Sequence, residues 1–140
     1  MKSNAKCPKW IEVTVKVCLT LFAIVVVAVC LFASWPSIDS KLKSKRFDSL
    51  TWNQNKEDVM WPNRLRMVDN LIASRLLIGK SRSEIVSILG PDDKNSGYFK
   101  DWHSVYQLGP ERGFIRIDSE WLVINFDLKG QCLEAIIKRD

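Results

Sequence analysis

The run of residues 17–38 contains no charged side chain, and this constrains the chain more than any other feature. Residues 17–33 are almost wholly apolar, and a helix of about 20 such residues spans the hydrocarbon core of a bilayer. Trp10 and Trp35 flank the run, as aromatic residues do at membrane interfaces. We therefore predict an uncleaved transmembrane anchor at 17–38, preceded by a polar tail at 1–16.

Two other interpretations of this run stay open. A cleaved signal peptide would need a cleavage site after Ala33, but Leu31 stands where a small residue is preferred. A lipoprotein signal would use Cys30, but Val29 precedes it where Ala, Gly or Ser is usual. Both fit the residues less well than a signal anchor, which holds the protein in the cell membrane by a single pass.

The net charge of +5 comes mainly from residues beside the apolar run. Four basic residues precede the run and four follow it, so their distribution does not set the orientation in the membrane: Lys2, Lys6, Lys9, Lys16, Lys41, Lys43, Lys45 and Arg46. This placement suits contact with anionic lipid head groups. A nucleic-acid-binding protein would carry its basic patch within the folded domain, so the bilayer is the expected partner and nucleic acid is not.

Strong helix signals follow a polar segment, 39–60, that we interpret as a linker. Pro62 suits the first turn of a helix, and apolar residues at helical spacing continue to Ile78. Ser81 and Glu84 have the spacing of a capping box, which predicts a second helix ended by Gly90 and Pro91.

The pattern then changes to the period of two that is typical of strands. We expect strands at 102–109, 121–127 and 131–139, the last two forming a hairpin. Alternation predicts that two sets face the helices: Leu122, Ile124 and Phe126, and Leu133, Ala135 and Ile137. The expected fold is α+β, a two-layer α-α-β-β-β sandwich over residues 61–140.

Two stretches also resemble a known family. Residues 79–92, GKSRSEIVSILGPD, are similar to the signature G-x-[ST]-x-x-[DE]-[VI]…LG-x-P of SmpA/OmlA (BamE)-like domains. Residues 102–109 and 121–130 resemble the family's later W-x-Y…L-x-V-x-F-D-x-[DN]-G pattern. The match covers about residues 63–139, whereas the lipobox of the outer-membrane assembly lipoproteins is missing. The resemblance implies a bacterial envelope domain, on the periplasmic side, that binds or assembles other proteins.

Residues with catalytic or ligand-binding chemistry are few. His103 is the only histidine, and no nucleophile or orienting group is evident for it. Asp92 and Asp93 read as a solvated turn, the 118–120 segment as a strand entry, and Cys132 as a packing residue without a disulfide partner in the domain. We expect no enzymatic activity, no cofactor and no metal site.

The surplus of apolar side chains on the sheet is more informative. Trp121 and Val123 should face away from the helices, and Tyr106 is expected to join them. An exposed apolar face with aromatic residues commonly binds a protein partner. The alternative is that residues 47–52, or Phe114 and Ile115, fold over this face.

The function favoured by the sequence is therefore that of a non-enzymatic, membrane-tethered interaction module, whose partner is an envelope or membrane protein. Two alternatives stay open. One is an inhibitor-type binding protein of an envelope enzyme, because the fold of the family resembles that of the secreted β-lactamase inhibitor proteins. The other alternative is a membrane protein with an unassigned role.

Overall fold

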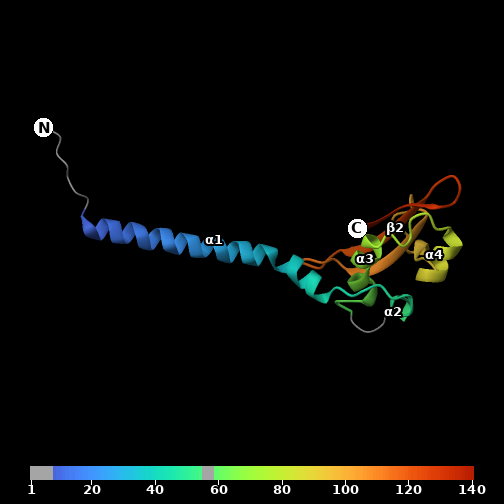
Figure 1. Ribbon diagram of the computed structural model, residues 1–140, viewed down its shortest axis with the longest axis horizontal. Coiled ribbons are helices and arrows are strands. Elements are labelled where there is room, and N and C mark those ends of the chain that lie inside the picture. Colours follow the sequence, from blue (N-terminus) through green and yellow to red (C-terminus); the bar gives the residue numbers. More distant parts are fainter. Residues whose placement is uncertain (1–7, 55–58) are drawn as a thin grey trace. The chain divides into compact units, whose positions relative to one another are not determined.

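The computed structural model describes residues 8–54 and 59–140. The chain divides into two compact units, Met1–Trp35 and Pro36–Asp140. The first helix, α1, spans Lys9–Lys43 and so contributes to both units (Figure 1).

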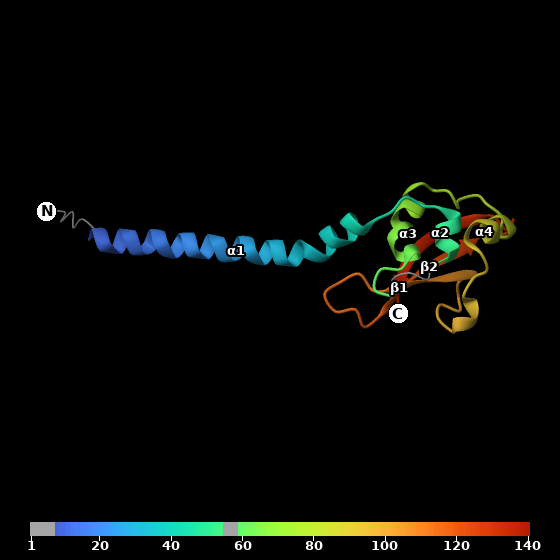
Figure 2. The ribbon, with the colours of Figure 1, turned by 90° about the horizontal axis from the view of Figure 1, so that it is seen from below.

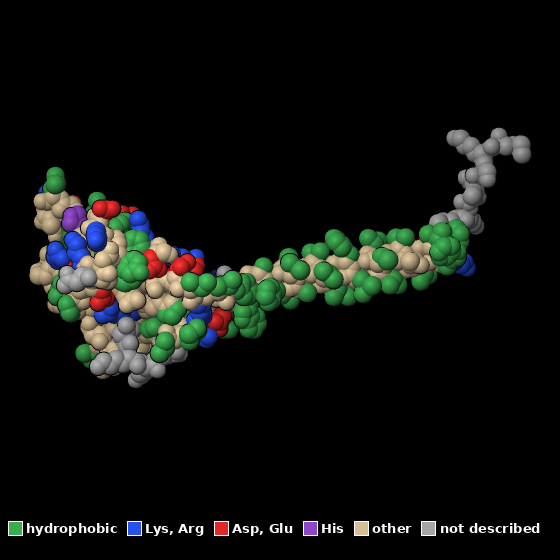
Figure 3. Space-filling model, turned by 180° about the vertical axis from the view of Figure 1, so that it is seen from behind, with side chains coloured by type: hydrophobic (Ala, Val, Ile, Leu, Met, Phe, Trp, Pro, Cys, Tyr) green, Lys and Arg blue, Asp and Glu red, His purple; other side chains and the backbone are tan. Residues whose placement is uncertain are grey.

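The first unit consists of the apolar part of α1, whose side chains are almost all hydrophobic and exposed (Figure 3). Its Lys9–Trp35 portion, 27 residues, is long and apolar enough to cross a membrane, and such a helix is about 40 Å long. The polar tail expected at 1–16 is therefore helical from Lys9 onward, while residues 1–7 lie outside the described part of the chain.

The second unit combines short helices with one antiparallel sheet, which agrees with the expected α+β class. Its helices are α2 (Ser49–Gln54), α3 (Asn63–Ala73), α4 (Arg82–Leu89) and a 3-10 turn, η1 (Lys94–Ser96). Its strands are β1 (Ser104–Pro110), β2 (Ser119–Phe126) and β3 (Cys132–Arg139), in the order β1-β2-β3 (Figure 2).

The cap signals around α4 are confirmed. The Ser81 hydroxyl accepts a hydrogen bond from the Glu84 N–H, and the Glu84 carboxylate accepts one from the Ser81 N–H at 2.8 Å. Gly90 ends the helix at φ +79°, and a Cβ at this position would collide with the side chain of Asn53. Glycine is thus required at this end by both conformation and space.

Helix α3 is shorter than predicted, because it ends at Ala73 rather than Ile78. The Ser74 hydroxyl bonds the Leu71 carbonyl oxygen at 2.7 Å, and Arg75 takes a left-handed φ of 53°. Since a left-handed residue cannot continue a helix, the chain turns there. The turn brings Leu77 into the core, where it is 2% exposed.

One face of the sheet packs against the helices and forms the main core. Leu122 and Ile124 are fully buried there, and Phe126 packs against them, as predicted. Ala135 and Ile137 of β3 join the same cluster. The expected linker also contributes: Trp52 of α2 is fully buried, and residues 39–60 are therefore partly integral to the unit, with 55–58 outside the described residues.

Leu133 departs from the prediction, because it is 67% exposed and Cys132 is buried in its stead. The register of β2 against β3 is irregular between Asn125 and Phe126, and Cys132 pairs with Phe126. An irregularity of this kind interrupts simple alternation. The predicted inward set of β3 is therefore wrong at its first member.

Candidate functional site

The face of the sheet opposite the main core does not form the open surface expected from the sequence. Trp121 and Val123 do lie on this face, in a second cluster with Val105, but they are 2% and 0% exposed. The segment 97–102 covers them, with the Tyr98 ring centroid 5.0 Å from that of Trp121. The expected exposure of Trp121 and Val123 is thus wrong.

Among the described residues, the aromatic side chains that pack against the second cluster come from a segment that was not expected to cover it. Phe99 and Trp102 pack against the second cluster, and both belong to the segment between α4 and β1. Trp102 lies in a turn rather than in β1, since its N–H donates to the Phe99 carbonyl oxygen at 2.9 Å. Trp102, predicted in a strand, and Phe99, predicted in a loop, therefore both cover the outer face of the sheet.

Tyr106 lies on the other face of the sheet, which corrects its predicted position. It pairs with Leu122, is fully buried in the main core, and its hydroxyl donates to the Gly90 carbonyl oxygen at 3.1 Å. Burial, followed by the nearby negative charge of Asp92, raises the pKa of Tyr106 to about 12. Tyr106 therefore contributes to packing and not to an exposed surface.

His103 contacts residues of the neighbouring strand β2. Its Nδ1 accepts the Phe126 N–H at 3.2 Å and lies 3.1 Å from the Asn125 side-chain oxygen. Its ring also packs edge-on against the Phe126 ring at 5.8 Å. Among the described residues, these ring contacts include neither a nucleophile nor a carboxylate.

The acidic pair 92–93 is held by arginines and backbone groups. Asp92 lies 3.1 Å from Arg82, and Asp93 lies 2.9 Å from Arg64 and also accepts the Gln107 N–H at 3.0 Å. The pair ties the α4–β1 connection to α3, α4 and β1. Within residues 8–54 and 59–140, no group of three His, Cys, Asp or Glu side chains is placed to hold a metal ion.

A buried charge cluster centres on Glu120, which the sequence predicts to be part of a strand entry. The Glu120 side chain is completely buried, and its carboxylate is 2.8 Å from the Arg112 guanidinium and 3.4 Å from that of Arg139. Arg112 also pairs with Asp69 of α3 and lies 3.4 Å from the Ser40 hydroxyl.

The charged side chains of the Glu120 cluster pair with one another, Arg112 with Glu120 and Asp69, and Arg139 with Glu120 and Glu111. Burial lowers the pKa of Arg112, but hydrogen bonds with Glu120 and Asp69 outweigh burial and raise it overall. Buried charges are tolerated when paired in this way. The cluster therefore connects the end of α1 with α3, β2 and β3, and its charged side chains are paired with one another.

Cys132 is also enclosed. Its side chain is 2% exposed and its sulfur lies 3.8 Å from the Glu134 carbonyl oxygen. Burial raises the pKa of the thiol, partly offset by that contact. Because the thiolate is the reactive form, this environment disfavours a reactive thiol.

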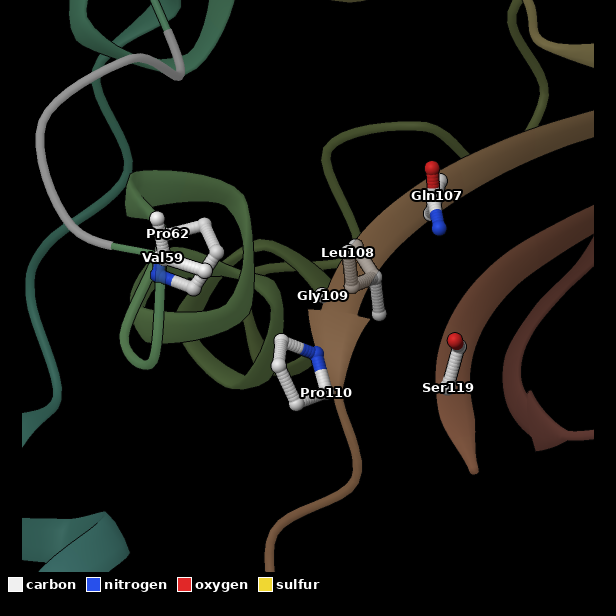
Figure 4. A pocket seen from close by; sticks show the side chains of 7 residues that line it. All are labelled: Val59, Pro62, Gln107, Leu108, Gly109, Pro110 and Ser119. Carbon is white, nitrogen blue, oxygen red and sulfur yellow. The ribbon is translucent and has the colours of Figure 1, made fainter. Parts of the chain in front are cut away.

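A pocket of about 270 Å³ lies at the end of β1, beside the start of α3 (Figure 4). Pro62 and Pro110 point toward it, and a Cβ on Gly109 would meet the Pro62 ring at 2.7 Å. Its polar side chains are those of Gln107 and Ser119. The described residues of the lining therefore offer packing and hydrogen bonding, and none of them carries an ionisable side chain.

A second pocket, of about 370 Å³, lies between the turn after α3 and strand β3. We call it the β3 groove, lined by Ile72, Arg75, Ile78, Leu133, Glu134 and Ala135. Ile78 is 48% exposed and Leu133 is 67% exposed, so the groove presents apolar surface to solvent. It is the candidate functional site, because it combines exposed apolar side chains with an edge of the sheet.

The outer edge of β3 is only partly occupied. Cys132 exchanges backbone hydrogen bonds with Gly79 and Lys80, at 2.9 and 2.8 Å. From Leu133 onward, the described residues provide no further backbone partner along this edge. Unpaired strand edges are templates for the addition of another strand.

No protein-family model, curated protein or solved structure matches this chain.

Proposed function

We propose that this protein is a non-enzymatic, membrane-tethered module that binds an extended segment of an envelope protein in the β3 groove. The observation that carries the proposal is Leu133, an exposed apolar residue at the start of an edge strand and beside an open pocket. The α1 helix supplies the tether, since its Lys9–Trp35 portion is long and apolar enough to cross a membrane.

Strand addition explains why the pocket and the edge occur together. An extended peptide that pairs with an edge strand gains main-chain hydrogen bonds, while alternate side chains enter pockets that select the sequence. Ile78 and Leu133 would receive an apolar side chain, and Arg75 and Glu134 at the rim offer one charge of each sign. The expected ligand is thus an extended segment with an apolar anchor and polar neighbours.

The resemblance to SmpA/OmlA (BamE)-like domains supports the same assignment. It rests on the order of helix, capped helix and three strands, and on the caps at Ser81 and Gly90. On this basis we propose that the protein lies in the cell membrane as a single-pass protein, with the Pro36–Asp140 unit in the periplasm.

The test places a photo-crosslinking amino acid at Leu133 of the full-length protein in its native membranes. Leu128 is the matched control, because it is a fully exposed leucine in the turn between β2 and β3. We expect one partner to crosslink through an extended segment at position 133 and not at 128. The same crosslink, formed from a second groove position at Ile78, should be lost with Leu133→Asp and kept with Leu128→Asp.

Two outcomes would contradict the proposed site. Equal crosslinking at positions 133 and 128 would indicate random encounter, and a crosslinked partner that survives Leu133→Asp would bind elsewhere. Near-ultraviolet circular dichroism of both aspartate variants shows whether the unit remains folded. Since both leucines are exposed, neither change should unfold it.

A further inference from the structure

The loop between β1 and β2 carries apolar side chains where a turn normally carries polar ones. Ile115 and Ile117 are 70% and 84% exposed, and Phe114 is 53% exposed. Gly, Asn, Asp, Ser and Pro dominate ordinary turns for conformational reasons. Exposed apolar clusters of this kind mark surfaces that another phase or molecule covers.

The two arginines of this loop, by contrast, are held against the body of the unit. The Arg116 guanidinium donates to the Met60 carbonyl oxygen at 2.7 Å and stacks on the Trp61 ring at 4.3 Å. Arg112 is held by Glu120, and the Glu111 N–H closes the base of the loop onto the Asp118 carbonyl oxygen at 2.8 Å. The loop is therefore fixed at its base and through its arginines, with isoleucines at the surface.

The same arginines place the loop beside the point where the chain enters this unit. Arg116 lies 3.9 Å from the Asp39 carboxylate, and Arg112 lies 3.4 Å from the Ser40 hydroxyl. Asp39 is four residues from Trp35, the end of the segment able to cross a membrane. Four residues span at most about 14 Å even when fully extended, so this limit holds for any arrangement of the two units.

We propose that the tip of this loop, Ile115 and Ile117, inserts into the lipid interface beside the anchor, an inference that rests on the membrane tether of the proposed function. The polar interface of a bilayer is about 5–7 Å thick on each side, which is within the reach set by Asp39. Exposed Lys41 and Arg46, close in sequence to Ser40, carry charges that suit anionic head groups. The bilayer is also present at high effective concentration, because the chain is tethered to it.

This contact would restrict how the unit turns on its tether. The loop precedes β2, whereas the β3 groove lies at the start of β3, near the turn that follows β2 and thus at the opposite end of the sheet. With the loop at the membrane, the groove would face away from the bilayer and toward partners in the aqueous phase. Lipid contact by the loop thus deepens the proposed role of the groove.

The test uses the full-length protein in vesicles of phosphatidylcholine and phosphatidylglycerol, with and without nitroxide-labelled lipid. A small environment-sensitive fluorescent amino acid is placed at one position at a time: 115, 117, 128 or 21. Leu128 is the control within the same unit, and Leu21 reports the anchor. Positions 115 and 128 flank β2, whose eight residues span roughly 25 Å, so we expect at least about threefold more lipid quenching at 115 and 117 than at 128.

The outcomes separate this inference from the tether itself. Quenching at 21 but not at 115 or 117 overturns the lipid contact and leaves the tether standing. Absence of quenching at all positions overturns both. Equal quenching at 115 and 128, or shielding of 115 from aqueous iodide without lipid quenching, also overturns the inference, the latter because a protein would then cover the loop.

Discussion

Replacement of Trp121 by Ala is the most direct test of the covered outer face of the sheet. Trp121 is 2% exposed and contacts Tyr98 and Phe99, with ring centroids at 5.0 and 6.2 Å. A buried tryptophan removes about 200 Å² from water, which at about 25 cal/mol per Å² corresponds to roughly 5 kcal/mol. Because alanine keeps part of this area, we expect the free energy of unfolding to fall by about 3–5 kcal/mol.

The matched variant is Trp121→Phe. The Trp121 Nε1–H is buried and has no hydrogen-bond partner among the described residues, so phenylalanine removes an unsatisfied donor while keeping most of the packing. The loss of stability should then be below about 1.5 kcal/mol. A third variant, Tyr98→Ala, combined with Trp121→Ala, measures the ring contact, for which coupling of about 0.5–1.5 kcal/mol is expected.

The assay is urea unfolding of the full-length protein in detergent, followed by near-ultraviolet circular dichroism, which reports tertiary packing around aromatic rings. A small domain has a total stability of about 5–15 kcal/mol, so a loss of 3–5 kcal/mol is easily measured. If Trp121→Ala costs less than about 1 kcal/mol, or no more than Trp121→Phe, the segment 97–102 does not cover the sheet and the face is open.

Three further predictions concern buried or capping groups. Glu120→Ala should destabilise the unit by about 3–5 kcal/mol, because it leaves Arg112 buried without its main partner; the double variant Glu120→Ala/Arg112→Met should recover much of this loss in urea unfolding. Ser81→Ala should cost about 0.5–2 kcal/mol. Hydrogen bonds from the Ser81 hydroxyl and N–H lower the pKa of Glu84, so the contribution of this cap should be present above the ordinary Glu pKa and be lost as pH falls through the lowered one; denaturation midpoints of wild type and Ser81→Ala should therefore converge in acid. The pKa of Tyr106 is raised to about 12, so its contribution to the free energy of unfolding should be complete below the ordinary pKa of 10 and be lost as pH rises from 10 to 12. The ultraviolet absorbance of phenolate, compared between wild type and Tyr106→Phe, can follow this titration.

Local features were predicted well from the sequence, because their causes are local. The capping box of Ser81 and Glu84 depends on a three-residue spacing, and Gly90 ends its helix by backbone conformation. The inward positions of Leu122 and Ile124 follow from alternation within one uninterrupted strand. None of these features requires knowledge of which strand pairs with which.

Features that depend on distant segments could not be predicted in this way. Tyr106 was assigned to the outer face because its pairing with Leu122 is set by the register between strands, which a single strand does not reveal. The exposure predicted for Trp121 is wrong because segment 97–102 folds over the sheet. The sequence of this loop has no periodic pattern from which such a fold could be predicted. Glu120 gave only one weak signal of a buried charge, since it is an acidic residue within a strand. Its partner Arg112 comes from a turn, so the strand pattern could not reveal the pair.

The candidate site itself arises from such a long-range feature. Between Asn125 and Phe126 the register of β2 against β3 shifts, and this places Cys132 in the core and leaves Leu133 exposed beside Ile78. Simple alternation predicts a buried Leu133. In that position its side chain would no longer line the β3 groove. The irregularity thus determines both a buried core thiol and an apolar side chain at an open sheet edge. If strand addition at β3 is the function, restoring regular pairing at this point should close the groove without reducing the stability of the core.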